Sequence, residues 1–566
     1  MQTRILGCGV ANCASGDSRV GQPRPRPFGS TGPRWMATGA LLCLVLGGAG
    51  AGANAADRVG GQTLVFQTRT REQMPSGRHA VRIGQVEWPA DKTAFVVCDM
   101  WDRHWSPTAT RRVAEMAPRM NALLKVARDR GALIIHCPSD TLDFYKDTPQ
   151  RARAQAAPAV ATTIPLERWC RLQPDREGAL PIDDSDGGCD ALPPGKNHKA
   201  WSRQIATLEI FPEDAITDSA EAFYLMKARG IDRVVVMGVH TNMCVLGRPF
   251  SIRQLVRQGQ QVLLLRDLTD TMYNPRQAPY VHHCTGTDLV IEHIEKHWCP
   301  TATSVDLLGG REFRFSEDTR PHAVVLMAED EYRTEETLPT WVAKHLGREF
   351  RTTLLHGSET ERNDLPGLES LRTADVLLVS VRRRSLPAAQ LQQVRDFVER
   401  GGAVVGIRTA NHAFSLRDNA PPPEGHAAWL DFDPEVLGGH YTGHHGAGPQ
   451  VALSVPAGSQ THPLLTGVDL AQLSGRGSLY KVNPLATSAI PVLIGEIPGV
   501  PAEPVAWTYT NRFGGRVFYT SLGHVDDFAQ AGFQRLLLNA LRWSAGLAVD
   551  PPASEIPNPP ADKTRG

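Results

Sequence analysis

The stretch Val234-Val235-Val236-Met237-Gly238-Val239-His240-Thr241-Asn242-Met243-Cys244-Val245 decides the fold of the first half of the chain. A β-branched, apolar run ends at Gly238 and an amphipathic segment begins near Cys244, a pattern typical of a buried parallel strand followed by a helix. At the start of a helix, free N–H groups and the helix dipole favour a thiolate over a thiol. Cys244 is therefore a candidate nucleophile. The alternative is a small buried core residue, as free cysteines often are.

Short apolar runs alternate with segments of helical spacing on both sides of this stretch. Such alternation predicts a mostly parallel sheet with helices on both faces. Ligands bind at the carboxyl ends of these strands, which is where Asp99, His136 and Cys244 fall. The predicted strands are 94–98, 132–136, 233–237 and 262–265, and the predicted helices are 111–130, 219–229 and 245–258.

The length and charge of the chain limit its architecture and its partners. A chain of 566 residues is too long for one hydrophobic core, so we expect two or three domains. Lysine plus arginine and aspartate plus glutamate both number 60. Because this balance creates no global attraction to polyanions, we expect no nucleic-acid partner.

The first 55 residues have the composition of an export signal. An Arg-, Pro- and Gly-rich stretch precedes the apolar block Met36–Leu46, and Ala53 and Ala55 supply the small residues of a cleavage site. We predict a signal peptide with a long n-region over 1–55, an exported (periplasmic or extracellular) protein, and no membrane span after cleavage. Translation from the methionine that opens the apolar block would equally explain the long n-region. Residues 547–566 are predicted to be a disordered tail.

The cysteines after this leader leave at least one thiol unpaired. Of ten cysteines, seven follow the leader and all seven precede residue 300. An odd number suits a free nucleophile. Cys170 and Cys189 lie in an irregular region and form the one pair that a disulfide would join in an exported protein.

Three motifs of the first domain resemble the isochorismatase-like cysteine hydrolases, a family that includes nicotinamidases and N-carbamoylsarcosine amidases. The resemblance covers residues 80–312 and implies an open α/β sheet with helices on both faces. Its most specific motif is the last of the three, whereas the other two are weak on their own. The motifs are Val96-Val97-Cys98-Asp99-Met100, Lys199 before Trp201-Ser202-Arg203, and Gly238-Val239-His240-Thr241-Asn242-Met243-Cys244-Val245.

The resemblance implies a catalytic triad of Asp99, Lys199 and Cys244. In it Cys244 attacks, Asp99 moves the proton from the thiol to the leaving amine, and Lys199 stabilises the thiolate. Lys196, three residues away, is the alternative lysine. Members of the family that cleave a vinyl ether lack the cysteine. The presence of Cys244 therefore points to hydrolysis of a C–N bond in a small amide, imide or carbamoyl compound.

The same resemblance assigns the turn before the nucleophile. Backbone N–H groups of this turn, which includes His240, would form an oxyanion hole near Met243 and Cys244, which is worth about 100- to 1000-fold in rate. The bond between Val239 and His240 is expected to be cis.

Residues near the first aspartate are the expected substrate contacts. We predict that the substrate pocket is lined by Trp101, Asp102, His104, His136 and His240, with the tryptophan against a planar or apolar part of the substrate. The spacing departs from the metal-binding motif of nicotinamidases, so neither a nicotinamide substrate nor a cofactor is expected. The alternative is a divalent cation held by Asp102, His104 and His136.

A second open α/β sheet is predicted over residues 320–546. Its motifs resemble the ThuA-like (trehalose-utilisation) family, which has the fold of class I glutamine amidotransferases. No cysteine follows Cys299, so glutaminase chemistry is excluded there. The motifs are Gly401-Gly402-Ala403-Val404-Val405-Gly406-Ile407-Arg408-Thr409-Ala410-Asn411-His412, Gly439-His440 and Phe518-Tyr519-Thr520-Ser521-Leu522-Gly523-His524. The predicted strands are 322–327, 374–379, 403–407 and 516–521, and the predicted helices are 335–346, 388–400 and 528–543.

Histidines dominate the expected ligand site of this second domain. His412, His440 and His524 are predicted to hydrogen-bond a carbohydrate or a similar polar molecule. A divalent metal in the His-rich loop 438–445 is the alternative.

Taken together, the sequence predicts an exported cysteine amidohydrolase fused to a ThuA-like module, acting on a small molecule and able to form a homo-oligomer. The first rival hypothesis is a carbohydrate-binding or carbohydrate-processing protein whose first domain is non-catalytic. The second is a non-catalytic assembly protein. An ionised thiol at Cys244 near neutral pH distinguishes the hydrolase from both.

Overall fold

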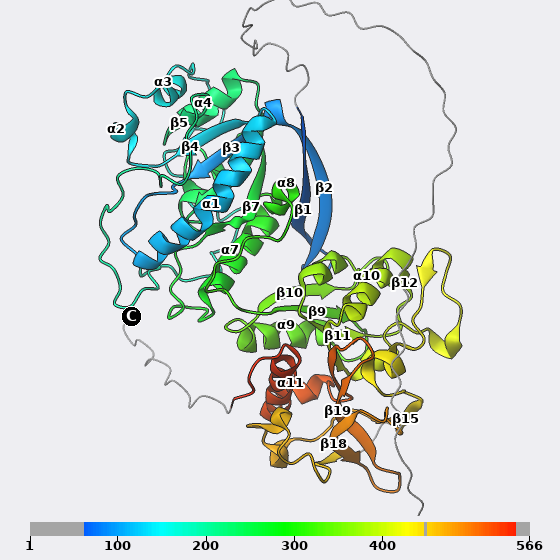
Figure 1. The fold of residues 1–566 in the computed structure, drawn as a ribbon. Coiled ribbons are helices and arrows are strands. Elements are labelled where there is room, and N and C mark those ends of the chain that lie inside the picture. Colours follow the sequence, from blue (N-terminus) through cyan, green and yellow to red (C-terminus); the bar gives the residue numbers. More distant parts are fainter. Residues whose placement is uncertain (1–61, 447–449, 551–566) are drawn as a thin grey trace, which may run out of the picture. The chain divides into compact units, whose positions relative to one another are not determined.

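A computed structural model describes residues 62–446 and 450–550. The predicted signal peptide, residues 447–449 and residues 551–566 of the predicted tail lie outside these residues. Two separate eight-stranded sheets with flanking helices make up the described chain (Figure 1), which confirms the predicted fold class. Among the described helices, none is both long enough and apolar enough to cross a membrane.

The first sheet has the strand order β2-β1-β8-β7-β6-β3-β4-β5. Strands β8 to β5 in this order are parallel, and β1 and β2 form an antiparallel hairpin at one edge. The strands are β1 Thr63–Gln73, β2 His79–Pro89, β3 Thr93–Cys98, β4 Leu133–Cys137, β5 Ala215–Ile216, β6 Arg233–Val239, β7 Gln261–Asp270 and β8 Thr301–Ala302. The helices are α1 Pro107–Asp129, α2 Leu142–Tyr145, α3 Pro149–Gln155, α4 Glu221–Ala228, α5 Cys244–Gly247, α6 Ile252–Arg257, α7 His283–His297 and α8 Val305–Leu308.

Strand β3 shows why this sheet is buried on both faces. All six of its residues are buried, and alternate side chains enter different apolar clusters. Val96 packs with residues of α4, α6 and α7, whereas Phe95 and Val97 pack with residues of α1. Because side chains alternate across a strand, the unbroken apolar run fills both cores at once.

The structure differs from the sequence-based prediction at two places in this first module. The sheet begins at Thr63 rather than near residue 80, because Leu64 and Phe66 are buried between exposed neighbours and form an edge hairpin. The helix predicted over 245–258 is two helices, α5 and α6. Pro249 cannot continue a helix and holds Arg248 extended, at φ −71° and ψ 156°.

The second module carries the sheet β10-β9-β11-β13-β20-β19-β18-β16. Strands β10 to β20 in this order are parallel and the remaining three are antiparallel. The strands are β9 His322–Ala328, β10 Arg351–His356, β11 Val376–Val381, β13 Ala403–Ile407, β16 Ala452–Ser454, β18 Ile490–Glu496, β19 Glu503–Thr510 and β20 Arg516–Thr520, and short pairs join β12 Leu386–Pro387 to β14 His426–Ala427 and β15 Gly443–His445 to β17 Leu479–Lys481. Its helices are α9 Thr334–His345, α10 Ala388–Glu399 and α11 Ala531–Ser544.

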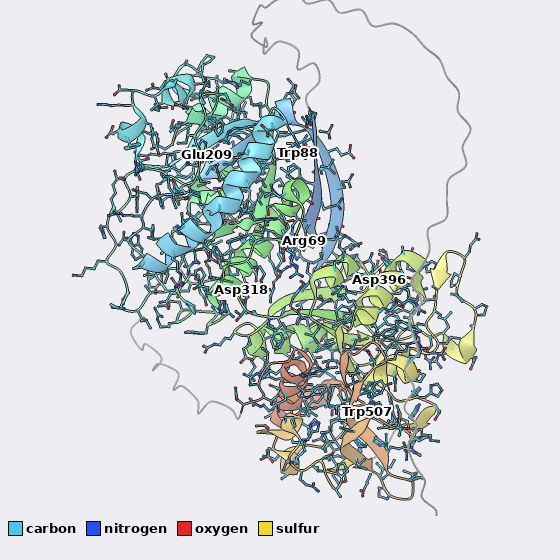
Figure 2. All side chains as sticks on the ribbon, viewed as in Figure 1. Arg69, Trp88, Glu209, Asp318, Asp396 and Trp507 are labelled. Carbon is cyan, nitrogen blue, oxygen red and sulfur yellow. The ribbon has the colours of Figure 1, made fainter. Side chains whose placement is uncertain are left out.

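A buried tryptophan ties the antiparallel part of this sheet to its surroundings. Trp507 on β19 is fully buried, and its ring centroid lies 4.4 Å from that of Tyr519 on β20 (Figure 2). The indole N–H donates a 2.7 Å hydrogen bond to the carbonyl of Leu437. Burial of this large aromatic surface with its one polar atom satisfied stabilises the module.

We predict that Gly238→Ala strongly destabilises the protein. Gly238 has φ +110°, and a Cβ built on it would lie 2.0 Å from the carbonyl oxygen of Cys98. Since backbone on the neighbouring strand cannot move away cheaply, unfolding should become easier by more than about 2 kcal/mol. The measurement is thermal and urea unfolding.

The matched control is Gly178→Ala, because Gly178 is exposed and a Cβ there meets nothing within 4 Å. Its stability should remain within about 0.5 kcal/mol of wild type. An unchanged melting temperature for Gly238→Ala would contradict the close approach of β3 and β6.

Candidate active site

Asp99 and Cys244 meet at the carboxyl ends of the neighbouring strands β3 and β6. Cys98 and Gly238 are paired in the parallel register of these strands, and each chain then turns out of the sheet. Asp99 is fully buried with φ +47°, and Cys244 is 8% exposed as the first residue of α5. Non-glycine residues rarely adopt a positive φ, and such strain is concentrated at functional sites.

Burial controls the charge of this pair. It raises the pKa of the Cys244 thiol well above its usual value, and the neighbouring Asp99 carboxylate raises it further. Burial also raises the pKa of Asp99, against the opposing effect of Arg248. The sequence predicted that a helix N-terminus would favour the thiolate, but α5 has only four residues and a correspondingly weak dipole.

Arg248 is the cation beside this pair, and the sequence-based prediction missed it. Its Nε lies 3.6 Å from Oδ2 of Asp99, and its Nη2 lies 3.8 Å from Oδ2 of Asp140. The side chain is 15% exposed. The sequence holds one signal for this residue, because Arg248 lies four residues after Cys244 and directly before Pro249. A proline ends the helix there and turns Arg248 out of it.

Lys199 occupies a different position from the one that the triad implies. Its side chain is exposed, and Nζ donates a 2.6 Å hydrogen bond to the carbonyl of Asp140. Within the described chain Lys199 makes no ion pair with Asp99, and the alternative Lys196 is exposed as well. The structure thus brings Asp99 and Cys244 together. Lys199 instead bonds Asp140, which follows Ser139 in the chain, and the N–H of Ser139 donates a 2.7 Å hydrogen bond to Asp99.

The turn before Cys244 has the expected form. The peptide bond between Val239 and His240 is cis, as the resemblance implied. The N–H of Met243 donates to the carbonyl of His240 at 3.0 Å, whereas the N–H of Cys244 donates to no backbone carbonyl in the described chain. Of the two groups considered for an oxyanion hole, the Cys244 N–H is the one left available.

A stack of aromatic rings adjoins this turn. The rings of Trp101 and Trp201 are stacked with centroids 4.2 Å apart, and His104 lies parallel to Trp201 at 5.7 Å. His240 meets the edge of His104 at 4.9 Å. The chain therefore brings Trp101, His104 and His240 together, as predicted substrate contacts, and adds Trp201.

Both imidazoles of this aromatic group are neutral near pH 7. Burial lowers the pKa of His104 to about 4 and that of His240 well below its usual value. Nε2 of His240 is buried and has no hydrogen-bond partner among the described residues. An unpaired buried polar atom is costly, so this nitrogen is suited to a hydrogen bond with a bound molecule.

Asp102 and His136 do not join His104 in a metal site. Asp102 accepts hydrogen bonds from Ser202 N–H and Oγ, at 2.9 and 2.7 Å. His136 is fully buried, and its two ring nitrogens bond Gln204 at 3.0 Å and Asp214 at 3.1 Å. The predicted contact of His136 with substrate is therefore corrected, because neither nitrogen is free.

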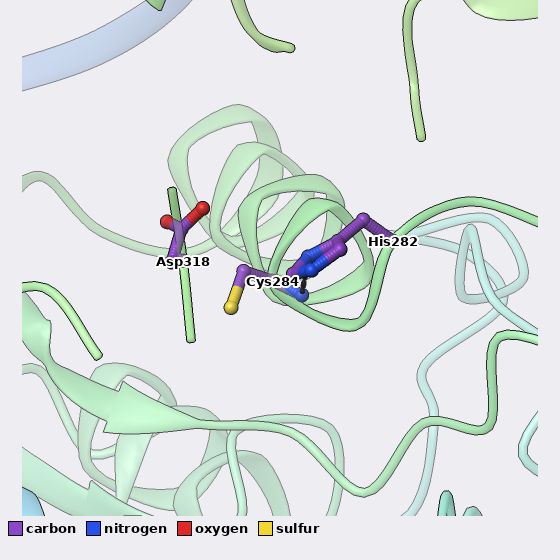
Figure 3. A group of neighbouring side chains, drawn as sticks. All are labelled: His282, Cys284 and Asp318. Atoms are coloured by element: carbon purple, nitrogen blue, oxygen red, sulfur yellow. Dashed lines mark hydrogen bonds between the residues drawn. The ribbon is translucent and has the colours of Figure 1, made fainter. Parts of the chain in front are cut away.

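In the described residues, one group of three metal-ligating side chains lies within 4.8 Å, namely His282, Cys284 and Asp318 (Figure 3). Two of them are already engaged, because Nδ1 of His282 accepts a hydrogen bond from the N–H of Cys284 at 3.1 Å and Asp318 forms ion pairs with Arg314 and Arg320. Burial raises the pKa of the third group, the Cys284 thiol, which disfavours the thiolate that a metal needs. The contact of His282 is that of a helix cap. The seven described cysteines, Cys170 and Cys189 included, are all free, so the suggested disulfide is absent.

In the second module, Arg408 lies between two tyrosine rings, one of which contacts the predicted His524. Arg408 follows β13 with φ +44° and is 3% exposed, and its guanidinium lies 4.4 Å from the ring centre of Tyr332 and 4.7 Å from that of Tyr480. It donates to the Ser521 carbonyl at 2.6 Å and to the Tyr332 hydroxyl at 3.2 Å. The ring of His524 meets that of Tyr332 at 5.6 Å.

The same ring cluster reaches the other two histidines through Tyr441. The ring of Tyr441 lies 4.7 Å from that of Tyr480 and 4.8 Å from that of His412. Asp433 accepts the N–H of Tyr441 at 2.9 Å and bonds Nδ1 of His440 at 3.0 Å. Burial lowers the pKa of His412 to about 3 and raises that of Asp433 to about 6.

Comparison with known protein families gives a match in the second module. Residues 322–544 match the protein family described as "ThuA: Trehalose utilisation", which confirms the family resemblance of the second module. No curated protein matches the chain in sequence.

Solved structures with similarity to parts of the chain include a ThuA-like protein from Bacteroides uniformis, at 16% identity and a TM-score of 0.30, covering 42% of this chain and 99% of that one. A cysteine hydrolase from Pseudomonas syringae pv. phaseolicola matches at 19% identity and a TM-score of 0.26, covering 39% and 93%. The N-carbamoylsarcosine amidase from Thermoplasma acidophilum matches at 12% identity and a TM-score of 0.21, covering 38% and 96%. At these identities the similarity extends to the fold alone.

We predict that the protein loses stability against unfolding in acid, because His104 takes up a proton more readily in the unfolded chain. The pKa of His104, about 4, lies below the ordinary 6.5, so its contribution is complete above pH 6.5 and is lost as the pH falls towards 4. Replacement by phenylalanine keeps a ring and removes the titration. Between pH 7.5 and 5, wild type should lose about 1–2 kcal/mol more stability than His104→Phe.

The measurement is urea unfolding of both proteins at the two pH values. Parallel losses of stability in wild type and His104→Phe would show that His104 binds protons equally well in both states.

Proposed function

We propose that the chain is an exported hydrolase that cleaves the C–N bond of an amide, imide or carbamoyl compound through Cys244, fused to a module that binds a carbohydrate or related ligand. The observation that carries the proposal is the burial of one thiol, one carboxylate and one guanidinium together at the carboxyl ends of β3 and β6. Export rests on the composition of residues 1–55.

The first half of the reaction uses Asp99 as base and then as acid. The Cys244 sulfur attacks the carbonyl carbon while the thiol proton passes to Asp99. The carbonyl oxygen becomes an oxyanion, which accepts a hydrogen bond from the backbone N–H of Cys244. The C–N bond then breaks, and Asp99 returns the proton to the leaving nitrogen. A carboxylate with a raised pKa is a better base than an exposed one, which suits this exchange.

The second half restores the enzyme. Water attacks the thioester carbon and gives one proton to Asp99, the C–S bond breaks, and the sulfur regains the proton from Asp99. The products are an acid and an amine or ammonia, and no electron acceptor is needed. The neutral rings of Trp101, His104 and His240 favour an uncharged, planar group on the substrate.

We predict that Cys244→Ser and Asp99→Asn each lower kcat/KM for ammonia release by at least about 1000-fold. Serine is a much weaker nucleophile than cysteine here, and asparagine cannot accept the thiol proton. The measurement is ammonia release from a panel of amides, cyclic imides and carbamoyl compounds, with the most active compound taken forward.

The matched control is Cys284→Ser, because Cys284 is also a buried thiol at a helix start. It should retain full activity. Hydroxylamine added during turnover should yield a hydroxamate by intercepting the thioester. Full activity of Cys244→Ser would exclude the covalent route.

A second candidate function belongs to the second module, where aromatic rings and hydrogen-bonding groups gather around Tyr441. Rings of this kind pack against sugar faces, and the adjoining Asp433, His440 and His412 supply polar partners for hydroxyl groups. In the rival form of the proposal, this binding is the main activity and the first module is non-catalytic.

We predict that a neutral mono- or disaccharide raises the melting temperature of the full chain. At about 100 times Kd the stabilisation should be about 2.7 kcal/mol. His412→Ala should abolish the shift because it removes a ring and a polar partner from the cluster. His426→Ala is the control, since His426 is half-buried on β14 and its side chain bonds, among the described residues, only the carbonyl of Glu424.

The assay is thermal unfolding with a panel that includes trehalose, glucose and their reduced or oxidised derivatives. A panel without any shift would count against sugar binding, and a shift retained by His412→Ala would place the sugar elsewhere.

A further inference from the structure

We propose that Arg248, rather than a lysine, is the cation that holds the Asp99–Cys244 pair in its singly charged, reactive state. The inference rests on the proposed function, in which this pair must carry one negative charge. It assigns to Arg248 the role that the family resemblance implied for Lys199.

Two unpartnered buried atoms carry the assignment. Oδ1 of Asp99 accepts the N–H of Ser139 at 2.7 Å, whereas Oδ2 has no hydrogen-bond partner among the described residues. Nε of Arg248 is also buried without a partner. The two atoms lie 3.6 Å apart, too far for a good hydrogen bond, and the Cys244 thiol is the third group at this place.

The surroundings of Arg248 offer no second cation to Asp99. In the described chain Arg248 is the one basic side chain with a nitrogen within 4.0 Å of Asp99. The other groups near it are Asp140, which is 44% exposed on its side chain, and the buried thiols of Cys98 and Cys137, whose pKa values burial raises well above the usual range. Asp218 accepts the N–H of Asp140 at 3.0 Å and adds further negative charge.

Local structure fixes Arg248 in this position. Its N–H donates to the Cys244 carbonyl at 3.0 Å, and Pro249 holds its backbone extended. Its guanidinium lies 5.5 Å from the ring centre of Trp169, and the same ring lies against Gly247, where a Cβ would be 2.8 Å from it. The arginine is therefore held by the same short segment that begins with the nucleophile.

Charge counting explains what the arginine does. Transfer of one proton from Cys244 to Asp99 moves the negative charge but does not change its amount. A neighbouring guanidinium therefore stabilises both forms of the pair against the form with two protons. Without Arg248, a buried negative charge would stand without a cation, so both groups would remain protonated at neutral pH and Asp99 could not act as a base.

The test is the pH dependence of iodoacetamide labelling at Cys244 in the full chain, mapped by mass spectrometry. Labelling of wild type should rise in two steps. The first lies between the ordinary pKa of an aspartate, 3.8, and that of a free cysteine, about 8.5, and marks loss of the first proton from the pair. The second lies at higher pH and marks loss of the other proton.

Arg248→Met should move the first step up by at least one pH unit, with a tenfold or greater loss of labelling rate below it. Arg248→Lys should show little of this shift because it keeps the positive charge. Lys199→Met is the matched control and should keep the wild-type profile, since Lys199 is exposed and bonded to the Asp140 carbonyl. Folding is checked by the melting temperature, and Arg248→Gln replaces the methionine variant if that protein does not fold.

Three outcomes would overturn the assignment. A shifted profile in Lys199→Met with an unshifted one in Arg248→Met would return the role to the lysine and leave the proposed hydrolase intact. A shift in Arg248→Lys as large as that in the neutral variants would show that charge is not the cause. A wild-type Cys244 that labels in one step, like an ordinary buried thiol, would overturn both the charged pair and the proposed nucleophile.

Discussion

The first module brings Asp99, Cys244 and Arg248 together, and the proposed chemistry depends on one buried negative charge that Asp99 and Cys244 would share. A charge in such a place is stable only if a cation lies close to it, and Arg248 lies 3.6 Å from the carboxylate. Several backbone features serve this arrangement. Gly238 lets β6 approach the carbonyl of Cys98, and Pro249 ends α5 after one turn, so that the proposed nucleophile and the arginine fall in the same short segment.

Two groups of residues near the turn before Cys244 differ in charge. One consists of the neutral rings of Trp101, His104 and His240, whose imidazoles burial keeps uncharged. The other consists of Asp99 and Arg248. This separation suits a reaction in which an uncharged substrate is bound by the rings and negative charge develops only at the reacting carbonyl. The proposed hydrolase follows from that arrangement more than from any single residue.

The two modules place different chemistry at equivalent points of similar sheets. Asp99 and Arg408 each follow a central strand directly, and their φ values are +47° and +44°. In the first module this position holds a carboxylate beside a thiol. In the second it holds a guanidinium that bonds the Ser521 carbonyl and lies between two tyrosine rings, so this position serves packing.

The sequence alone determined the two sheets, the strands that end just before Asp99, before the turn to Cys244 and before Arg408, and the absence of a cysteine from the second module. Unbroken apolar runs and residue identities are local properties. It could not assign the cation, because only the folded chain shows that Arg248 lies beside Asp99 whereas Lys199 bonds Asp140. It also could not foresee that His136 is held by Gln204 and Asp214, or that burial outweighs a one-turn helix in setting the pKa of Cys244. Distances across the sheet and the exclusion of water decide these points, and both exist only in the tertiary structure.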